Sequence, residues 1–492
     1  MKRKSVTRLL AAAMTMTVLA AGMTGCGSEK KESGDTPVDA DEQTPAADTK
    51  QDTEQPAADA EADVEEENGY TVLTDADGNV YDLGGMEIII RNWWSPEEPE
   101  EPTNAYEEAV AEWRDWCMET YNFKIRELGI SSYESAPEDF VNYATTGGDE
   151  NYIFVLRSDG TLVSAMYSGL MTDLATLDCL DFSEKKWSGG VDELFSIGDS
   201  KYAMYALTPE PRVGTYFNKR LLEEAGIDPE ELYKWQENGE WTFDKCREVM
   251  GQVQRDIDND GVIDIYGTSN DKEAFFSESI FSNGGQLVSK GADGKYVLEV
   301  DSEKTLAGLN WAQELLDDFD LVKPEDANWD YYKQAFLNGD AVFCFDRAYM
   351  AGQDFKDMED DFGFICYPKG PGASDYTNVW SNNPVVIPAC YDEQKAWNIA
   401  FAYNLYTAEI PGYEDYEGWK AGYYNNFRDT ESVDLTLARM VENGVVNYAD
   451  VIPNLAQGED FIWKLDEEMT PAQVAEEIKN AWQSYIDDAN SK

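Results

Sequence analysis

The chain has 492 residues and a formal net charge of −60, because it contains 98 acidic and only 38 basic residues. Such a charge repels phosphates and anionic membrane surfaces, which excludes nucleic acid as a partner and leaves neutral or cationic ligands open. The chain also lacks histidine, which excludes His-ligated zinc sites and Ser-His-Asp triads.

The N-terminal segment, residues 1–25, has the pattern of a bacterial signal peptide. Four basic side chains precede an apolar stretch over residues 9–23 that is too short to span a bilayer. The small residues before Cys26 resemble a lipobox, so we expect cleavage after residue 25 and a lipid on the Cys26 sulfur. The alternative is an ordinary signal peptide with an incidental cysteine. A lipid on Cys26 would anchor the protein at the extracellular face of the cytoplasmic membrane without spanning it.

An acidic segment follows over residues 26–68, and it contains no aromatic residue. It cannot bury enough apolar surface to fold, so we expect a disordered linker that carries the lipidated cysteine at its start. A functional acidic tail is the alternative. About 420 residues remain from Gly69 onward, which is more than one hydrophobic core usually supports and therefore predicts two lobes.

Strand and helix patterns alternate along the folded part. Residues 70–82 predict a hairpin, a β-branched run at residues 87–91 predicts a buried strand, and apolar residues at helical spacing predict a helix over residues 104–120. Further strands are predicted at residues 124–127, 152–156, 201–206 and 341–345, with helices beginning at Thr242, near residue 306 and at Thr470. This alternation predicts an α/β fold with parallel sheets.

Six further cysteines lie beyond Cys26, and none forms a C-x-x-C pair. Most of them lie in apolar runs, which favours buried free thiols, although an even number outside the cell also permits disulfides in fifteen arrangements. They are Cys117, Cys179, Cys246, Cys344, Cys366 and Cys390.

Four segments of the folded part occur in a characteristic order. They are Thr-Tyr-Phe-Asn-Lys at residue 215 with Ala-Gly-Ile-Asp-Pro at residue 225, Glu-Trp-Thr-Phe-Asp at residue 240, Phe-Leu-Asn-Gly-Asp-Ala-Val-Phe at residue 336, and Gly-Phe-Ile-Cys-Tyr-Pro-Lys-Gly at residue 363. Together they resemble the family 1 extracellular solute-binding proteins, the group that includes maltose-type binding proteins. The resemblance spans nearly all of the folded part.

The resemblance implies a two-lobed α/β protein of the type II periplasmic-binding-protein-like fold, with its ligand in a cleft between the lobes. It implies a monomeric receptor for an ABC importer that captures a small solute, most readily a mono- or oligosaccharide, with a membrane permease as partner and no catalytic residues. By position, crossovers are expected near Thr208, Cys366 and residue 400. Lobe 1 would then comprise residues 69–208 and 367–403, and lobe 2 residues 209–366 and 404–492.

Aromatic planes and polar side chains are the groups that hold a sugar in such a cleft. Trp93 and Trp94 directly follow the first predicted strand, and ligands of open α/β sheets bind at the C-terminal ends of strands. We therefore expect one of the two in the cleft. Tyr216 and Asn218 lie in the segment that enters lobe 2, although Asn218 can instead cap the following helix.

Further candidate ligand-binding residues lie in lobe 2 and near the second crossover. Asp346, Arg347 and Tyr349 follow the predicted strand at residues 341–345, where the resemblance implies an aromatic ring against the sugar. Asp346 and Arg347 can alternatively form a structural ion pair. Trp380 and Trp419 lie in loops, and we expect each to face the ligand.

One acidic loop has the spacing of a calcium site. Asp256, Asp258, Asp260 and Asp264 occupy positions 1, 3, 5 and 9 of an EF-hand-like pattern with glycine at position 6. Position 12 is Gly267, where a bidentate glutamate would be expected. The sequence therefore predicts either a structural calcium ion or a carboxylate-rich turn, and no other cofactor.

Two rival functions remain open from the sequence. A secreted glycoside hydrolase needs only two suitably spaced carboxylates, which 98 acidic residues could supply. A binder of a peptide, a polyamine or another non-sugar solute would suit the acidic composition, because aromatic boxes also bind amines.

Overall fold

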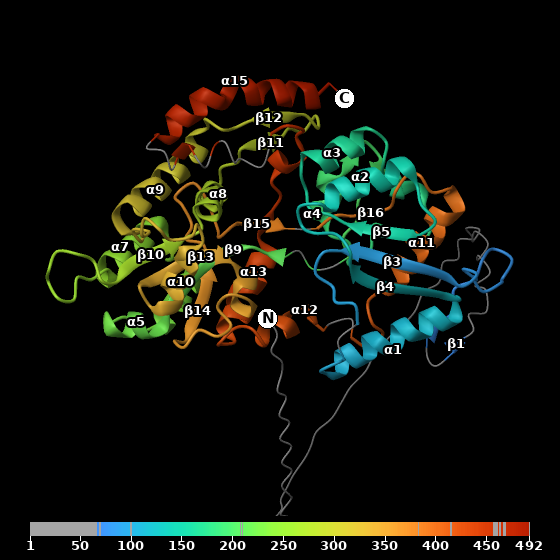
Figure 1. Cartoon of the computed structure of the whole chain (residues 1–492), viewed down its shortest axis with the longest axis horizontal. Coiled ribbons are helices and arrows are strands. Elements are labelled where there is room, and N and C mark those ends of the chain that lie inside the picture. Colours follow the sequence, from blue (N-terminus) through green and yellow to red (C-terminus); the bar gives the residue numbers. More distant parts are fainter. Residues whose placement is uncertain are drawn as a thin grey trace, which may run out of the picture. The chain divides into compact units, whose positions relative to one another are not determined.

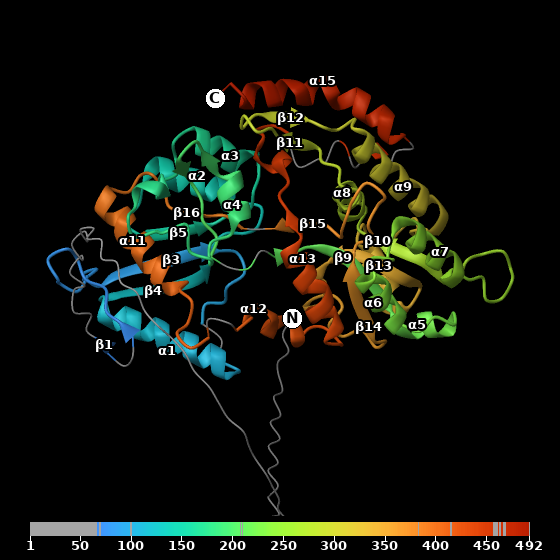
Figure 2. The ribbon, with the colours of Figure 1, turned by 180° about the vertical axis from the view of Figure 1, so that it is seen from behind.

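The computed structural model describes residues 66–67, 70–98, 101–206, 208, 210–381, 383–413, 416–455, 461, 464–465 and 469–491. They belong to one compact unit, Ala62–Lys492, which contains two four-stranded sheets covered by helices (Figure 1 and Figure 2). The predicted signal peptide, Cys26 and most of the linker lie outside the described residues. None of the described helices is long and apolar enough to cross a membrane.

Lobe 1 is built on a sheet with the strand order β16-β5-β3-β4. β3 runs parallel to β4 and β5, whereas β16 is antiparallel to β5. Side chains of β5 alternate between two cores, because Ile153 enters the core beside α1 and α11 and Phe154 enters the core beside α2 and α3. The elements are β3 (Met86–Asn92), α1 (Ala105–Thr120), β4 (Phe123–Gly129), α2 (Ala136–Thr146), β5 (Asn151–Val155), α3 (Gly160–Tyr167), α4 (Gly189–Leu194), β16 (Val385–Val386) and α11 (Glu393–Tyr406).

Lobe 2 is built on a sheet with the strand order β10-β13-β9-β14. β10 and β13 are parallel, and β9 runs antiparallel to both of its neighbours. Every side chain of β9 and β14 is buried, as expected for strands covered on both faces. The elements are β9 (Val213–Asn218), α5 (Lys219–Glu224), α6 (Glu230–Glu237), α7 (Phe243–Val253), β10 (Tyr266–Asn270), α8 (Lys272–Ser282), α9 (Glu303–Phe319), α10 (Tyr331–Asn338), β13 (Ala341–Arg347), β14 (Phe362–Cys366), α12 (Trp419–Tyr424), α13 (Ala438–Glu442) and α15 (Pro471–Ala489).

Several predicted element boundaries are confirmed by their caps. Asn104 and Thr242 accept hydrogen bonds from the first turns of α1 and α7, and Thr470 forms a capping box with Gln473 at the start of α15. The strand predicted at residues 201–206 is wrong. That segment continues only the short strand β7 (Ser200–Lys201) and then makes an isolated bridge from Met204 to Val385, so most of it has no partner strand.

A small three-stranded sheet joins the lobes at the crossovers. It has the order β17-β15-β8 and consists of β8 (Glu210–Pro211), β15 (Asn378–Ser381) and β17 (Gly444–Val445). β15 pairs antiparallel with β8 and parallel with β17. Three separate parts of the chain are therefore fixed to one another at the junction of the lobes.

The crossovers lie later in the chain than two of the predicted positions. The first, at β8, follows Thr208 closely. After Cys366 the chain stays with lobe 2, because Tyr367 and Tyr376 belong to the lobe 2 core, and it changes lobe only at β15. Ile410 still packs in the lobe 1 core, so the third crossover follows it rather than residue 400. Both cores use the same apolar residue types, which is why the sequence does not reveal these positions.

The lobes also meet away from the small sheet. A short 3-10 helix, Tyr448–Val451, follows β17, and the Tyr448 hydroxyl donates a hydrogen bond to the Glu193 carboxylate of α4. The Tyr448 ring lies 6.1 Å from that of Tyr296 in β12 (Tyr296–Leu298), which forms a hairpin with β11 (Val288–Lys290).

All six described cysteines are free, which is the alternative that the sequence favoured over disulfides. Cys117, Cys246, Cys344 and Cys366 are buried. Burial raises the pKa of the Cys117 thiol to about 12, so it is a protonated, unreactive core group.

Candidate functional site

A cavity of about 260 Å³ lies where the C-terminal ends of strands from both sheets meet the crossover sheet; we call it the first cavity. Tyr133 follows β4, Arg157 follows β5, Glu273 follows β10, and Arg347 ends β13. Ligand sites of open α/β sheets occur at such strand ends. The other lining residues are Ser158, Val191, Leu194, Phe195, Arg212, Val213, Ala274, Ser277, Glu278, Val379, Trp380, Asn383, Asn447 and Asp450.

A larger second cavity, of about 800 Å³, also has Trp380 in its lining. It is lined by helix and crossover residues, among them Arg114 of α1, Glu210 of β8 and Trp419 of α12. None of the four strand ends at the first cavity contributes to it. Position in the fold therefore favours the first cavity as the ligand site, although the second cavity is larger.

The two tryptophans after β3 lie beside the first cavity rather than in its lining. Trp93 is partly buried, and its ring lies 4.8 Å from that of Trp94 and 5.5 Å from that of Tyr133. Tyr133 itself lines the cavity, and the guanidinium of Arg157 lies 5.0 Å above its ring. Neither Trp93 nor Trp94 lines the first cavity, and Tyr133 is the aromatic side chain of this group that does.

Arg347 lines the first cavity and is held by two carboxylates. Its Nη1 lies 2.5 Å from Asp271 and 3.2 Å from Asp346. Asp346 is fully buried, accepts a hydrogen bond from the Tyr332 hydroxyl at 2.9 Å, and has a pKa raised by burial. The predicted ion pair of Asp346 and Arg347 is therefore present. Asp346 does not line the cavity itself but fixes the position of the Arg347 guanidinium, which does.

Tyr349 also lies next to an arginine of the first cavity. The guanidinium of Arg212 lies 5.5 Å from the centre of the Tyr349 ring. The same arginine pairs with Glu210 at 3.5 Å. Tyr349 therefore supports Arg212 and does not itself line the cavity.

Two predicted ligand residues lie in the core of lobe 2. The buried Tyr216 hydroxyl donates to the carbonyl oxygen of Ala348 at 2.8 Å. Asn218 is also buried; it caps α5 through the N–H of Leu221 and donates to Asp360 at 2.8 Å. The alternative role of Asn218 as a helix cap is the one that the structure shows.

Of the nine predicted ligand residues, the structure thus brings Arg347 and Trp380 together at the first cavity. Trp419 lines only the second cavity. Sequence reasoning missed Tyr133, Arg157 and Glu273. The strand-end rule, applied to the strands predicted at residues 124–127 and 152–156, would have pointed to Tyr133 and Arg157, whereas β10 was not among the predicted strands. Arg212 had no such signal, because it precedes its strand.

Two acidic side chains of the first cavity are held in unusual environments. Glu278 of α8 is 2% exposed, its Oε1 has no hydrogen-bond partner, and burial raises its pKa well above the usual range. Burial also raises the pKa of Asp450 to about 7, although the Asn447 amide donates to its carboxylate at 2.8 Å. Burial therefore shifts both carboxyl groups toward the neutral form.

We expect Asp450→Asn to flatten part of the pH dependence of stability. A folded-state pKa near 7, against 3.8 for the free side chain, makes stability fall as pH rises from about 4 to 7. The slope is at most about 1.4 kcal/mol per pH unit for one group, and less here because Asp450 is partly exposed to the cavity. Urea unfolding at pH 5, 6, 7 and 8 measures it. Equal slopes for wild type and Asp450→Asn would contradict the shifted pKa.

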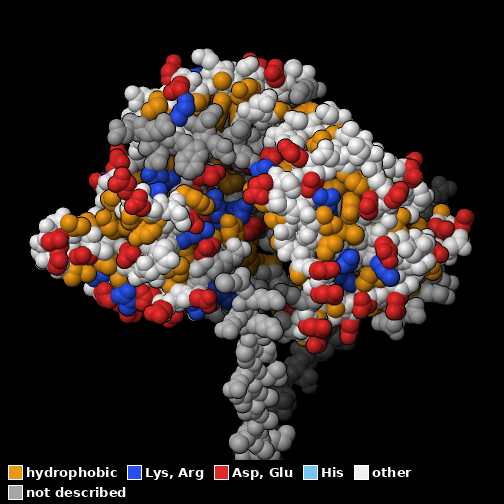
Figure 3. Space-filling model, in the orientation of Figure 1, with side chains coloured by type: hydrophobic (Ala, Val, Ile, Leu, Met, Phe, Trp, Pro, Cys, Tyr) orange, Lys and Arg blue, Asp and Glu red, His pale blue; other side chains and the backbone are white. Residues whose placement is uncertain are grey.

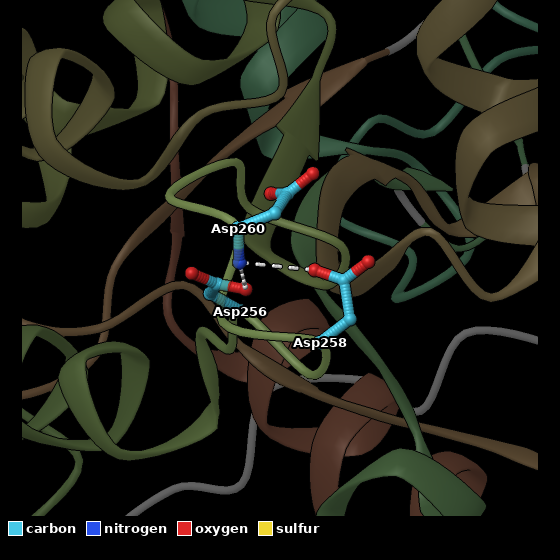
Figure 4. A group of neighbouring side chains, drawn as sticks. All are labelled: Asp256, Asp258 and Asp260. Carbon is cyan, nitrogen blue, oxygen red and sulfur yellow. Dashed lines mark hydrogen bonds between the residues drawn. The ribbon is translucent and has the colours of Figure 1, made fainter.

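The predicted calcium loop brings three carboxylates together (Figure 4). Oxygens of Asp256, Asp258 and Asp260 lie within 4.8 Å of one another, and the N–H of Asp260 donates to the first two at 3.2 and 3.1 Å. The Asp264 carboxylate accepts the N–H of Ile257 at 2.7 Å. Gly267 lies within β10, so position 12 of the pattern offers no side-chain ligand. The calcium ion stays a prediction.

Comparison with known proteins agrees with this architecture. The profile of the bacterial extracellular solute-binding protein family matches residues 144–407, more than half of the chain. No curated protein is similar enough in sequence to be matched to the chain.

Many solved structures share the fold at low sequence identity. A cyclic α-maltosyl-1,6-maltose-binding protein from Arthrobacter globiformis has 14% identity and a TM-score of 0.58 over 82% of this chain and 100% of its own. UgpB from Mycobacterium tuberculosis, in complex with glycerophosphocholine, has 16% identity and a TM-score of 0.57 over 82% and 99%. An ABC substrate-binding protein from Listeria monocytogenes, in complex with cycloalternan, has 15% identity and a TM-score of 0.53 over 83% and 98%.

The two lobes, the cavity at their strand ends and the match over residues 144–407 lead to one assignment. The chain belongs to the family of bacterial extracellular solute-binding proteins.

Proposed function

We propose that the protein captures a saccharide in the first cavity and delivers it to an ABC importer. The observation that carries this proposal is the composition of the cavity, which combines the aromatic side chains Tyr133 and Trp380 with a polar lining that includes Ser277, Asn383 and Asn447. Aromatic planes suit the C–H faces of a sugar, and polar groups suit its hydroxyls. One of the similar structures is a cyclic α-maltosyl-1,6-maltose-binding protein, and another is in complex with cycloalternan.

Solute capture works by closure of the two lobes. Arg157 belongs to lobe 1 and Arg347 to lobe 2, and both line the first cavity. A solute that touches both gains contacts only when the lobes are closed, so it favours the closed form by its difference in affinity. The permease would read the closed form, and no covalent bond of the solute changes.

The non-sugar alternatives are less well supported by the cavity. Three arginines in its lining disfavour a polyamine, because like charges repel in a confined site. Glycerophosphocholine in one similar structure keeps a phosphodiester solute as the second candidate. Hydrolysis of a saccharide would need a pair of carboxylates in defined acid and base roles, and membership of a binding-protein family argues for a receptor that does not catalyse.

A thermal-shift screen against saccharides, amino acids, peptides, polyamines and phosphodiesters tests the proposal. A solute at 100 times its Kd stabilises the folded protein by about 2.7 kcal/mol, which such a screen detects. A shift with a saccharide that is recovered unchanged supports a carbohydrate receptor. A shift with amines or peptides alone overturns the saccharide proposal, and cleavage of an oligosaccharide overturns the receptor.

The location of the protein follows from the same proposal. A diacylglycerol on Cys26 would anchor it at the outer face of the cytoplasmic membrane, where it would meet the permease as a monomer. Mass spectrometry of the N-terminal peptide from membranes tests the anchor. A peptide that begins elsewhere or carries no lipid on Cys26 would rule it out.

We also propose that the Asp256–Asp258–Asp260 loop binds a structural calcium ion. Saturating Ca²⁺ should raise the Tm of the wild-type protein, with about 2.7 kcal/mol of stabilisation at 100 times the Kd. Asp256→Asn should lose that rise, because it removes one of the three converging charges. Asp293→Asn, in the exposed turn of the β11–β12 hairpin, serves as the control. An equal Ca²⁺ response in both variants would argue against the loop.

A further inference from the structure

Three arginines line the first cavity of a chain in which acidic residues outnumber basic ones by 98 to 38. Arg157 follows β5 in lobe 1, Arg347 ends β13 in lobe 2, and Arg212 lies in the first crossover between β8 and β9. Figure 3 shows one face of the molecule, and Lys and Arg side chains gather around the hollow near its centre. The three arginines thus reach the first cavity from both lobes and from the segment between them.

The arginines keep hydrogen-bonding capacity beyond their present partners. A guanidinium carries five N–H donors in a planar fork. Arg157 pairs with Asp159 at 3.1 Å, and its buried Nε has no partner. Arg212 pairs with Glu210 at 3.5 Å, a distance that is long for a charged hydrogen bond. A carboxylate in the cavity would add charge-assisted hydrogen bonds to the guanidinium groups that line it.

The acidic side chains of the same lining cancel only part of this positive charge. They are Glu273, Glu278 and Asp450. Burial raises the pKa of Glu278 well above its usual range and the pKa of Asp450 to about 7. Both shifts reduce the negative charge that these carboxyl groups place beside the three arginines of the lining.

We propose that the solute of the first cavity is an acidic saccharide, whose carboxylate is held by Arg157, Arg212 and Arg347. This inference rests on the proposed saccharide function and narrows its substrate class. Arginine is suited to carboxylates because its planar fork matches their two oxygens. The three arginines come from lobe 1, the crossover and lobe 2, so one anionic group that reached them all would also hold the lobes closed.

Calorimetric titration of the purified full chain tests the charge of the solute directly. Trisaccharides of galacturonate, glucuronate and mannuronate are compared with their methyl esters, in which each carboxylate is replaced by a neutral group of similar shape. We expect one acid to bind at least about 30-fold more tightly than its ester, and 0.5 M NaCl to reduce the difference. Inorganic phosphate and sulfate, titrated alone, show whether a simple anion suffices.

Variants connect this effect to the first cavity. Arg157→Gln and Arg212→Gln should each weaken binding of the acid by about tenfold or more and leave the affinity for the ester nearly unchanged. Arg114→Gln removes an arginine that lines only the second cavity, and it should change neither affinity. Arg347 is left intact, because its removal would leave two carboxylates, Asp271 and the fully buried Asp346, without their shared cation.

The outcomes separate the two proposals. An ester that binds as tightly as its acid, or an Arg114→Gln variant that alone weakens binding, overturns the acidic-saccharide inference and leaves the saccharide function standing. Phosphate or sulfate binding as tightly as every saccharide also overturns it. Failure of all saccharides, acids and esters alike, overturns the saccharide function itself.

Discussion

Replacing Trp380 by alanine should weaken solute binding by at least about 30-fold, the effect expected for a central tryptophan in a binding site. Trp380 lies on β15, pairs through its main chain with Pro211 of β8, and lines both cavities. Its indole N–H lies 3.3 Å from the carbonyl oxygen of Met440, and a side chain added at Gly444 would overlap its ring. The ring is therefore held in place before the solute arrives, and its loss removes a preformed aromatic surface.

The control for this variant is Trp235→Ala. Trp235 is also partly buried and packs against the lobe 2 core, but it lines neither cavity. Calorimetric titration with the solute found in the screen, together with urea unfolding of both variants, separates binding from stability. Equal loss of affinity in both variants, or none in Trp380→Ala, would contradict the role of Trp380.

Gly308→Ala should lower the free energy of unfolding by at least about 2 kcal/mol, which is typical of forced overpacking in a core. Gly308 lies in α9 where that helix crosses α8. A Cβ at this position would overlap the carbonyl oxygen of Ser279 and lie 3.3 Å from the Cα of Ile280. Both contacts are backbone, so the two helices would have to separate. Because α8 also carries Glu273 and Glu278, solute binding should weaken as well.

Gly422→Ala is the matched control. This glycine lies in α12, and a Cβ there would meet nothing within 4 Å. Alanine is favoured over glycine in a helix by up to about 1 kcal/mol, so the control should be neutral or stabilising. Urea unfolding measures both variants. A Gly308→Ala protein as stable as Gly422→Ala would show that the α8–α9 contact is not tightly packed.

Local sequence patterns predicted those helices in which apolar residues recur at helical spacing over many residues. The helix beginning after Asn104 and the one beginning after Thr470 combine a cap with a regular apolar face, and both are present. The strand prediction at residues 201–206 was wrong. Beyond Lys201, which ends β7, this segment makes a single bridge, at Met204. Strand pairing depends on partners far away in the chain, which a local pattern does not contain.

The site was less predictable than the fold, for two physical reasons. Tyr216 and Asn218 lie in a recognisable segment, but β9 is buried on both faces, so its side chains serve the core. Arg157 and Arg212 belong to different elements, and only the fold at the crossovers places both in the lining of the first cavity. The two-lobed fold itself was predicted from the resemblance of several ordered segments to a known family. Such a resemblance can be recognised without knowing any side-chain contact.

The net charge of the chain and the lining of the first cavity favour different solutes. A value of −60 left neutral or cationic solutes open, whereas the first cavity gathers Arg157, Arg212 and Arg347. Exposed charges separated by more than about 10 Å are largely screened at 0.1 M ionic strength. A solute in the first cavity would therefore respond mainly to the charged side chains that line it, and the acidic outer surface would contribute little to its affinity.

The most direct measurement is a crystal structure of the protein with the saccharide identified in the thermal-shift screen. We expect the solute in the first cavity, in contact with Trp380 and with at least one arginine from each lobe. A solute in the second cavity, or one that touches a single lobe, would contradict capture at the strand ends.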